Sequence, residues 1–162
     1  MTGKAIITPP EKTEARNYVA LLGEETNGQL SYRFHAVQPG EGPPLHMHLE
    51  QAETFFIVSG SFIFQAGDDV VEVGPGTTLH VPKQTPHSFR CISDEAGKLT
   101  SVLTPGIHDG FIMNVPKAQA SGRSKEEVRA MALEFGTEIL GPPTLLEERF
   151  SNPSKSRGLN SI

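Results

Sequence analysis

The sequence has a single cysteine, Cys91, no tryptophan, and no apolar run approaching the roughly 18 residues that would suggest a membrane-spanning helix. One cysteine cannot form an internal disulfide, which suits a reducing compartment. Basic residues are also few: 14 Lys and Arg stand against 19 Asp and Glu, for a net charge of -5. This charge balance gives no sign of a basic surface that would bind nucleic acid. We therefore expect a soluble, cytoplasmic protein that binds neither nucleic acid nor membranes.

Glycine and proline, in contrast, are plentiful. The 16 Gly and 13 Pro are many for a helical protein and ordinary for a sheet protein with tight turns. Short apolar or alternating segments follow one another between turn residues. The predicted strands cover residues 18–22, 30–37, 45–48, 53–59, 61–66, 69–73, 77–82, 87–92 and 98–104. Many short antiparallel strands with regular turns predict an all-β sandwich or barrel.

The second predicted strand has a clear period of two. It follows Asn27-Gly28, which predicts a hairpin because both residues tolerate positive φ. The strand alternates an apolar set with a polar one, which is typical of a half-buried strand. The apolar set is Leu30, Tyr32, Phe34 and Ala36, and the polar set is Ser31, Arg33 and His35.

The pattern changes after residue 105. Ser124 and Glu127 form a capping box, and the apolar spacing that follows predicts a helix over residues 125–135, ended by Gly136. Such a helix must bury its apolar face on the barrel wall or over its mouth. We expect an arm at residues 1–16, a β-barrel at 17–115, a helical extension at 116–150 and a disordered tail at 151–162.

The most informative stretch runs from Gly40 to Gly60. His46 and His48 alternate along one predicted strand, so both imidazoles point to the same face. Glu53 opens the next strand, and a hairpin would bring its carboxylate beside the two rings. Two neutral nitrogens and one oxygen on one side of a metal ion leave its other side open for a substrate. A third histidine, His87, starts a later strand.

These residues resemble the motifs of the cupin family. The first motif is matched at every defined position, by Gly40, His46, His48, Glu53 and Gly60. The second is matched by Gly76, Pro82 and His87, and departs at Gln84, where the family usually has Gly, and at Cys91, where it usually has Asn. The motifs cover residues 40–91, and flanking strands extend the resemblance to about residues 18–105. It implies an all-β jelly-roll barrel with a short C-terminal helical extension.

The resemblance further implies that His46, His48, Glu53 and His87 ligate a divalent metal ion. The alternative is four polar residues that merely satisfy one another by hydrogen bonds. Four ionisable groups converging in an apolar barrel would be costly without a cation to pair them, which favours the metal. Imidazoles and a carboxylate suit Fe, Mn, Ni, Cu, Co or Zn. We expect Fe(II), because a redox-capable ion with open positions suits oxygen chemistry.

The leading functional prediction is a metal-dependent dioxygenase, similar to quercetin dioxygenases, acting on a small aromatic or enolic substrate. Glu53 is also the expected catalytic residue, and it either ligates the metal or acts only as the base that accepts a proton. The expected substrate contacts are Tyr32, Phe34, Phe55, Phe64, His80, Phe89 and Cys91. Aromatic residues of this kind also form ordinary barrel cores. Two alternatives stay open: a cupin isomerase, decarboxylase or lyase that does not use O2, and a non-catalytic small-molecule binder.

The fourth predicted strand also carries apolar residues on its outward face. Thr54, Phe56 and Val58 alternate with the inward set, and an outward aromatic there favours a partner surface. We therefore predict a homodimer formed by sheet-to-sheet packing, with the N-terminal arm contributing.

Overall fold

The computed structural model describes residues 5–8, 17–110, 114, 118, 121–143 and 146–148. The predicted tail at 151–162 lies outside these residues, as does most of the predicted arm at 1–16. The elements are β1 (Asn17–Leu21), the 3-10 helix η2 (Glu24–Thr26), β2 (Ser31–Val37), β3 (Leu45–His48), β4 (Ala52–Ser59), β5 (Phe62–Ala66), β6 (Asp69–Val73), β7 (Thr78–Val81), β8 (His87–Cys91), β9 (Gly97–Thr104), α2 (Lys125–Glu134) and β10 (Thr137–Gly141). The predicted strands between residues 18 and 104 are all present, with ends shifted by a residue at most.

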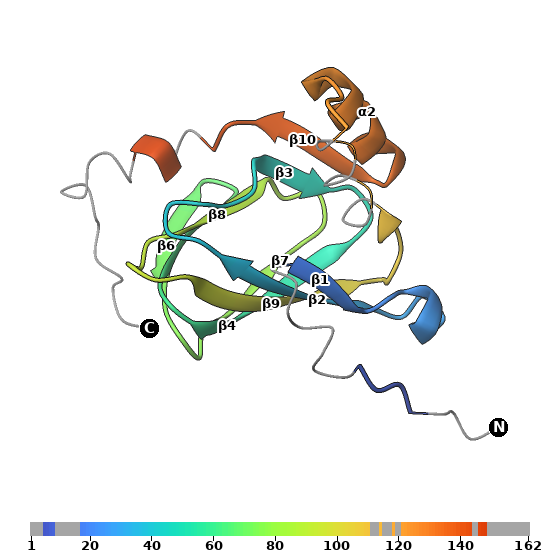
Figure 1. Ribbon diagram of the computed structural model, residues 1–162, viewed down its shortest axis with the longest axis horizontal. Coiled ribbons are helices and arrows are strands. Elements are labelled where there is room, and N and C mark those ends of the chain that lie inside the picture. The colour runs from blue at the N-terminus through green and yellow to red at the C-terminus, as the bar shows by residue number, and fades with distance from the viewer. Residues whose placement is uncertain are drawn as a thin grey trace.

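The strands form two five-stranded sheets. Sheet A has the order β1-β2-β9-β4-β7, and sheet B has the order β10-β3-β8-β5-β6. All the pairs within them are antiparallel. The two sheets face each other and enclose an interior, as Figure 1 shows. This arrangement confirms the predicted all-β fold of jelly-roll type.

Aromatic side chains from both sheets fill much of the interior. Phe55 of sheet A contacts Phe64 and Phe89 of sheet B, with ring centroids 5.1 and 5.9 Å apart. Phe62, Cys91 and Leu99 are fully buried in the same cluster. Burying a Phe or Leu side chain contributes roughly 1.5–3 kcal/mol to stability, so these contacts hold the two sheets together.

The inner face of β2 carries polar residues, whereas the alternation predicted that its apolar residues would face the interior. The period of two is confirmed, but Ser31 and Arg33 are buried whereas Tyr32 and Phe34 are only half-buried. Ser31 and Arg33 lie opposite Leu103 and Ser101 of β9, which are themselves fully buried. The apolar set instead covers the outer face, where neighbouring β1 supplies a partner for Phe34.

Three described non-glycine residues lie in the left-handed region: Asn27, Gln84 and His108. Asn27 has φ 53° and is followed by Gly28 at φ 77°, as the predicted Asn-Gly turn requires. The helix η2 precedes this turn and lengthens the connection between β1 and β2. Gln84 has φ 61°, and it occupies the position where the cupin motif usually has Gly. A non-glycine residue thus holds a left-handed backbone conformation at this motif position.

The predicted C-terminal helix is present and continues into an unpredicted strand. Ser124 and Glu127 form the expected capping box, and α2 buries Val128 and Ala132. After Gly136 the chain enters β10, which pairs with β3 at the edge of sheet B. Helix α2 lies beside β10, away from sheet A (Figure 1). Within the described residues, no helix has both the length and the apolar character needed to cross a membrane.

Candidate metal centre

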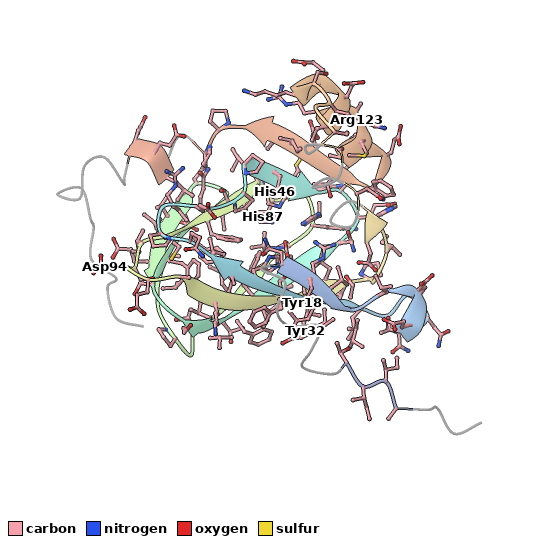
Figure 2. The ribbon with its side chains drawn as sticks, in the orientation of Figure 1. Tyr18, Tyr32, His46, His87, Asp94 and Arg123 are labelled. Carbon is pink, nitrogen blue, oxygen red and sulfur yellow. The ribbon has the colours of Figure 1, made fainter. Side chains whose placement is uncertain are left out.

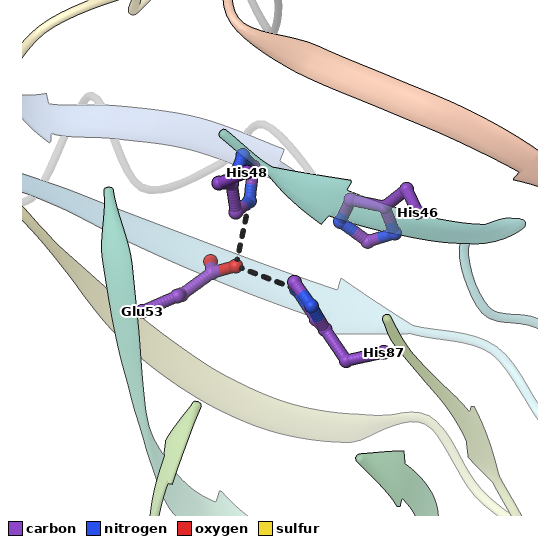
Figure 3. A group of neighbouring side chains, drawn as sticks. All are labelled: His46, His48, Glu53 and His87. Atoms are coloured by element: carbon purple, nitrogen blue, oxygen red, sulfur yellow. Dashed lines mark hydrogen bonds and ion pairs between the residues drawn. The ribbon is translucent and has the colours of Figure 1, made fainter. Parts of the chain in front are cut away.

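Four predicted ligand residues converge between the two sheets. His46 and His48 come from β3, Glu53 from β4 and His87 from β8. One possible ligand atom from each residue lies within 4.8 Å of the others, so the group could hold a metal ion. His46 and His87 are direct cross-strand partners of the β3–β8 pair, and their ring centroids are 4.3 Å apart. Figure 3 shows the three rings and the carboxylate turned toward a common centre.

Hydrogen bonds to Nδ1 fix the orientation of each ring. Nδ1 of His46 lies 2.9 Å from the carbonyl oxygen of Pro44, and Nδ1 of His87 lies 2.9 Å from that of Thr85. A carbonyl only accepts, so each Nδ1 carries the proton and donates it. In a neutral ring, Nε2 then has a free lone pair. Nδ1 of His48 lies 3.1 Å from the hydroxyl of Thr137 on β10, which allows the same tautomer.

The Glu53 carboxylate faces two of these rings. Its Oε2 lies 3.0 Å from Nε2 of His48 and 3.2 Å from Nε2 of His87 (Figure 3). Because the Nδ1 proton of His87 is committed to Thr85, a neutral His87 directs a lone pair at the carboxylate oxygen. Two electron-pair donors held this close in a buried site suit a cation that binds both. The donor set therefore fits a divalent metal ion of the first transition series.

Burial and neighbouring charge favour the protonation states that a metal ion needs. Burial lowers the pKa of His48, and it lowers the pKa of His46 well below the ordinary 6.5. Burial alone would raise the pKa of Glu53, but its interactions with His48 and His87 outweigh that and hold it well below the usual range. These directions favour neutral imidazoles at His46 and His48 and an ionised Glu53, which are the ligating states.

The predicted substrate contacts divide between the inner and outer faces. Phe55, Phe64, Phe89 and Cys91 are buried on inner faces, as expected. Of these, Phe55 borders the metal-ligand cluster, since its ring lies edge-on to His87 with centroids 6.0 Å apart. Phe64, Phe89 and Cys91 pack into the hydrophobic core.

The other three candidates lie on the outer face of sheet A, which corrects the expectation that they line the interior. Tyr32 and Phe34 alternate with the buried polar residues of β2, and Phe34 stacks on Tyr18 with centroids 5.3 Å apart. Figure 2 shows Tyr18 and Tyr32 on the side of sheet A away from His46 and His87. His80 pairs with outward-facing Thr54, and its Nδ1 lies 2.8 Å from the Thr54 hydroxyl. The alternation of these strands is confirmed, but the prediction of which face points to the interior is wrong.

Several inner polar residues were missed by sequence reasoning. Arg33 is buried and lies 3.7 Å from Asp109, which follows β9. His35 Nε2 lies 3.3 Å from the Ser101 hydroxyl, and burial lowers the pKa of His35 to about 4. Thr137 supports His48 from β10. Arg33 and His35 belong to the polar set of β2. Pairing β2 with β9 would have placed this set beside Leu99 and Ser101, which are buried, and so on the inner face.

Comparisons with known proteins agree with the fold. Residues 33–103 match the cupin domain family. The quercetin 2,3-dioxygenase of Bacillus subtilis is 33% identical over 88 residues, which make up 54% of this chain and 26% of that enzyme. The chain therefore spans only about a quarter of the length of that relative.

Solved structures show the same architecture. A Bacillus halodurans protein aligns with a TM-score of 0.53 and 21% identity, over 59% of this chain and 75% of that one. A predicted oxalate decarboxylase from Thermotoga maritima aligns with a TM-score of 0.53 and 18% identity, over 55% of this chain and 78% of that one. The fold and the motif residues define a jelly-roll protein with a candidate metal centre between its sheets. Residues 33–103, which hold all four candidate ligand residues, are similar to cupin domains.

Proposed function

We propose that this protein is a metal-dependent dioxygenase, with Fe(II) as its metal, that acts on a small aromatic or enolic substrate. The observation that carries the proposal is the convergence of three histidines and one carboxylate within 4.8 Å inside the jelly roll. The similarity to a quercetin 2,3-dioxygenase supports the reaction class. Fe(II) is favoured among the metals that suit these ligands because it is redox-capable.

The protein residues would divide the work as follows. A bound divalent ion would supply Lewis acidity to a substrate oxygen and, being redox-active, a route to O2 chemistry. Glu53 stays ionised at neutral pH, so its carboxylate can accept the proton of a substrate O–H group at hydrogen-bond distance. Phe55 gives the site an apolar wall beside His87, against which a flat substrate can pack and displace water.

A second candidate is a cupin reaction that needs no O2, such as an isomerisation, decarboxylation or elimination. The polar inner face of β2 favours it, because Ser31, Arg33 and His35 suit a smaller and more polar substrate than a flavonoid. Cation-assisted proton transfer by Glu53 would be common to both candidates.

Turnover with and without O2 separates the candidates. Protein loaded with Fe(II) under argon is mixed with a panel of phenols and enols, and then exposed to air. We expect O2 uptake coupled to substrate loss, and we expect Glu53→Gln to lower the rate more than it lowers the iron content. The matched control is Glu72→Gln at an exposed position of β6, outside the ligand cluster.

Three outcomes would count against the proposal. Conversion at full rate under argon would establish the second candidate. Tight binding of a panel compound with no conversion in either gas would establish a non-catalytic binder. Failure of the protein to retain iron would contradict the proposal of an Fe(II) dioxygenase.

A further inference from the structure

Arg33 is a buried cation with an unpaired Nε–H donor. The residue is 3% exposed, and its Nε has no hydrogen-bond partner among the described residues. Its nearest recorded counter-ion contact is Nη2 to Asp109 Oδ1 at 3.7 Å, which is too long for a good hydrogen bond. A guanidinium has five N–H donors in a planar fork. Leaving the buried Nε–H donor unpaired is costly unless another group accepts its hydrogen bond.

A second buried donor lies beside it. Ser31 precedes Arg33 by two residues on β2, so both side chains point to the same inner face. The Ser31 hydroxyl is also buried and without a hydrogen-bond partner in the described part of the chain. The Asp109 carboxylate accepts a hydrogen bond from the Gly23 backbone N–H at 2.6 Å, which ties that anion to the loop after β1. The arrangement leaves Ser31 and Arg33 available to a ligand.

These donors belong to the same interior as the metal-ligand cluster. Ser31 lies opposite Leu103 of β9, and Leu103 lies opposite Glu53 of β4. Burial lowers the pKa of Arg33, and the charges of Glu53 and then Asp109 oppose that shift. Arg33 and Glu53 are therefore close enough to interact electrostatically across the inner face of sheet A.

Charge balance indicates an anion as the missing partner. Histidines that ligate a metal ion are neutral, and the charged groups that the structure describes near Arg33 are then Glu53 and Asp109. A divalent ion and Arg33 would together carry three positive charges, against one negative charge each on Glu53 and Asp109. One positive charge would remain, and a monoanionic ligand would neutralise it. A carboxylate matches the guanidinium fork and can also accept from a hydroxyl.

We propose that Arg33 and Ser31 bind a carboxylate group of the ligand, so that the substrate is a small organic acid. This inference rests on the proposed function, because it assigns a substrate class to the same interior. It narrows the aromatic or enolic class to acids, and it gives the polar face of β2 a function. Phe55 then packs against the apolar part of the same molecule.

The test compares acids with their neutral amides. Dissociation constants are measured calorimetrically for acetate, benzoate and 2-hydroxybenzoate, and for the three corresponding amides, on protein loaded with Fe(II) under argon. We expect at least one acid to bind at least tenfold more tightly than its amide. In Arg33→Met that preference should disappear, while Arg33→Lys should keep part of it. Arg129→Met on the exposed side of α2 is the matched control.

A measurement on the unaltered protein covers the case in which Arg33→Met fails to fold. Arginine labelled with 15N gives a resonance for the buried Arg33 Nε–H, assigned with Arg33→Lys. We expect this resonance to shift on addition of the preferred acid and to stay in place with its amide. Iron content, measured in parallel, separates the two proposals: unchanged iron with equal binding of acids and amides overturns the Arg33 assignment alone. Loss of iron binding in the wild-type protein would overturn the proposed function instead.

Discussion

Thr137 and His48 face each other across the β10–β3 pair, and Thr137 Oγ1 lies 3.1 Å from His48 Nδ1. The two residues are 89 positions apart in the sequence, and both are buried. A hydrogen bond to the non-ligating nitrogen fixes the tautomer and the orientation of a metal-binding imidazole. β10 thus extends the candidate metal centre beyond the two sequence motifs.

Replacing this hydroxyl should weaken metal binding without removing it. Thr137→Val keeps the shape of the side chain but not its hydrogen bond, so we expect metal affinity to fall about 10–100-fold. Competition with a chromophoric chelator measures the change. Thr78→Val, at an exposed position of β7, is the control. Equal affinities in the two variants would show that Thr137 does not support the site.

The left-handed backbone at Gln84 predicts a stabilising substitution. A non-glycine residue in this region costs roughly 1–2 kcal/mol, so Gln84→Gly should raise the free energy of unfolding by about 1 kcal/mol. The change also removes an exposed 3.3 Å hydrogen bond from Gln84 Nε2 to the Leu49 carbonyl. Gln84→Ala removes the same bond but keeps the unfavourable φ, and it is therefore the control. If urea unfolding finds the Gly variant no more stable than the Ala variant, the left-handed conformation of Gln84 has no measurable cost and the prediction is wrong.

The buried His35 predicts acid sensitivity of the metal-free protein. Its pKa is about 4 when folded, against 6.5 for a free imidazole, so the unfolded chain takes up the proton first as the pH falls. Stability should therefore be lost progressively between about pH 6.5 and 4, by up to about 3 kcal/mol from this residue. Above that window His35 has no effect on the pH dependence.

His35→Gln tests that assignment. Glutamine can still hydrogen-bond to Ser101 but does not titrate, so its stability should fall less steeply between pH 6.5 and 4. Urea unfolding of metal-free protein at several pH values measures both slopes. Identical slopes for the wild-type protein and the variant would assign the acid sensitivity to other groups.

The outer face of sheet A supports the proposal of a homodimer. Phe56 is 41% exposed and Val58 is 51% exposed, on β4, which lies between β9 and β7 in that sheet. Apolar side chains gathered on one face favour burial against a second copy. Phe56→Glu should therefore give a monomer by light scattering at micromolar concentration. Leu133→Glu, on exposed α2, should leave the mass unchanged, and a monomeric wild-type protein would reject the proposal.

The sequence predicted the strands and the ligand cluster because both depend on local pattern. The spacing of His46 and His48 on one strand needs only a period of two, and the turns that bring Glu53 and His87 beside them carry strong local signals. The cupin resemblance added the requirement that β3, β4 and β8 meet. Neither local pattern nor the resemblance predicts β10. It is a short strand, and it pairs with β3, which lies about 90 residues earlier in the sequence.

The side on which β2 buries its residues could not be predicted from β2 alone. Its apolar set looked like the core-facing one, but Phe34 is covered by Tyr18 of β1, and the interior takes Arg33 instead. A strand whose two faces are both covered gives no reliable sign of which face is inner. The same ambiguity affected His80, whose partner Thr54 places it outside. Tertiary packing decided both cases.

The most direct test of the metal centre is the metal content of three purified proteins after loading with Fe(II) under argon and dialysis. We predict about one iron per chain in the wild-type protein and in His80→Ala, since His80 lies on the outer face of sheet A. His46→Ala should lose most of its iron, because a ligand from the converging set of four is gone. Full iron content in His46→Ala, or none in the wild-type protein, would contradict the assignment of this site.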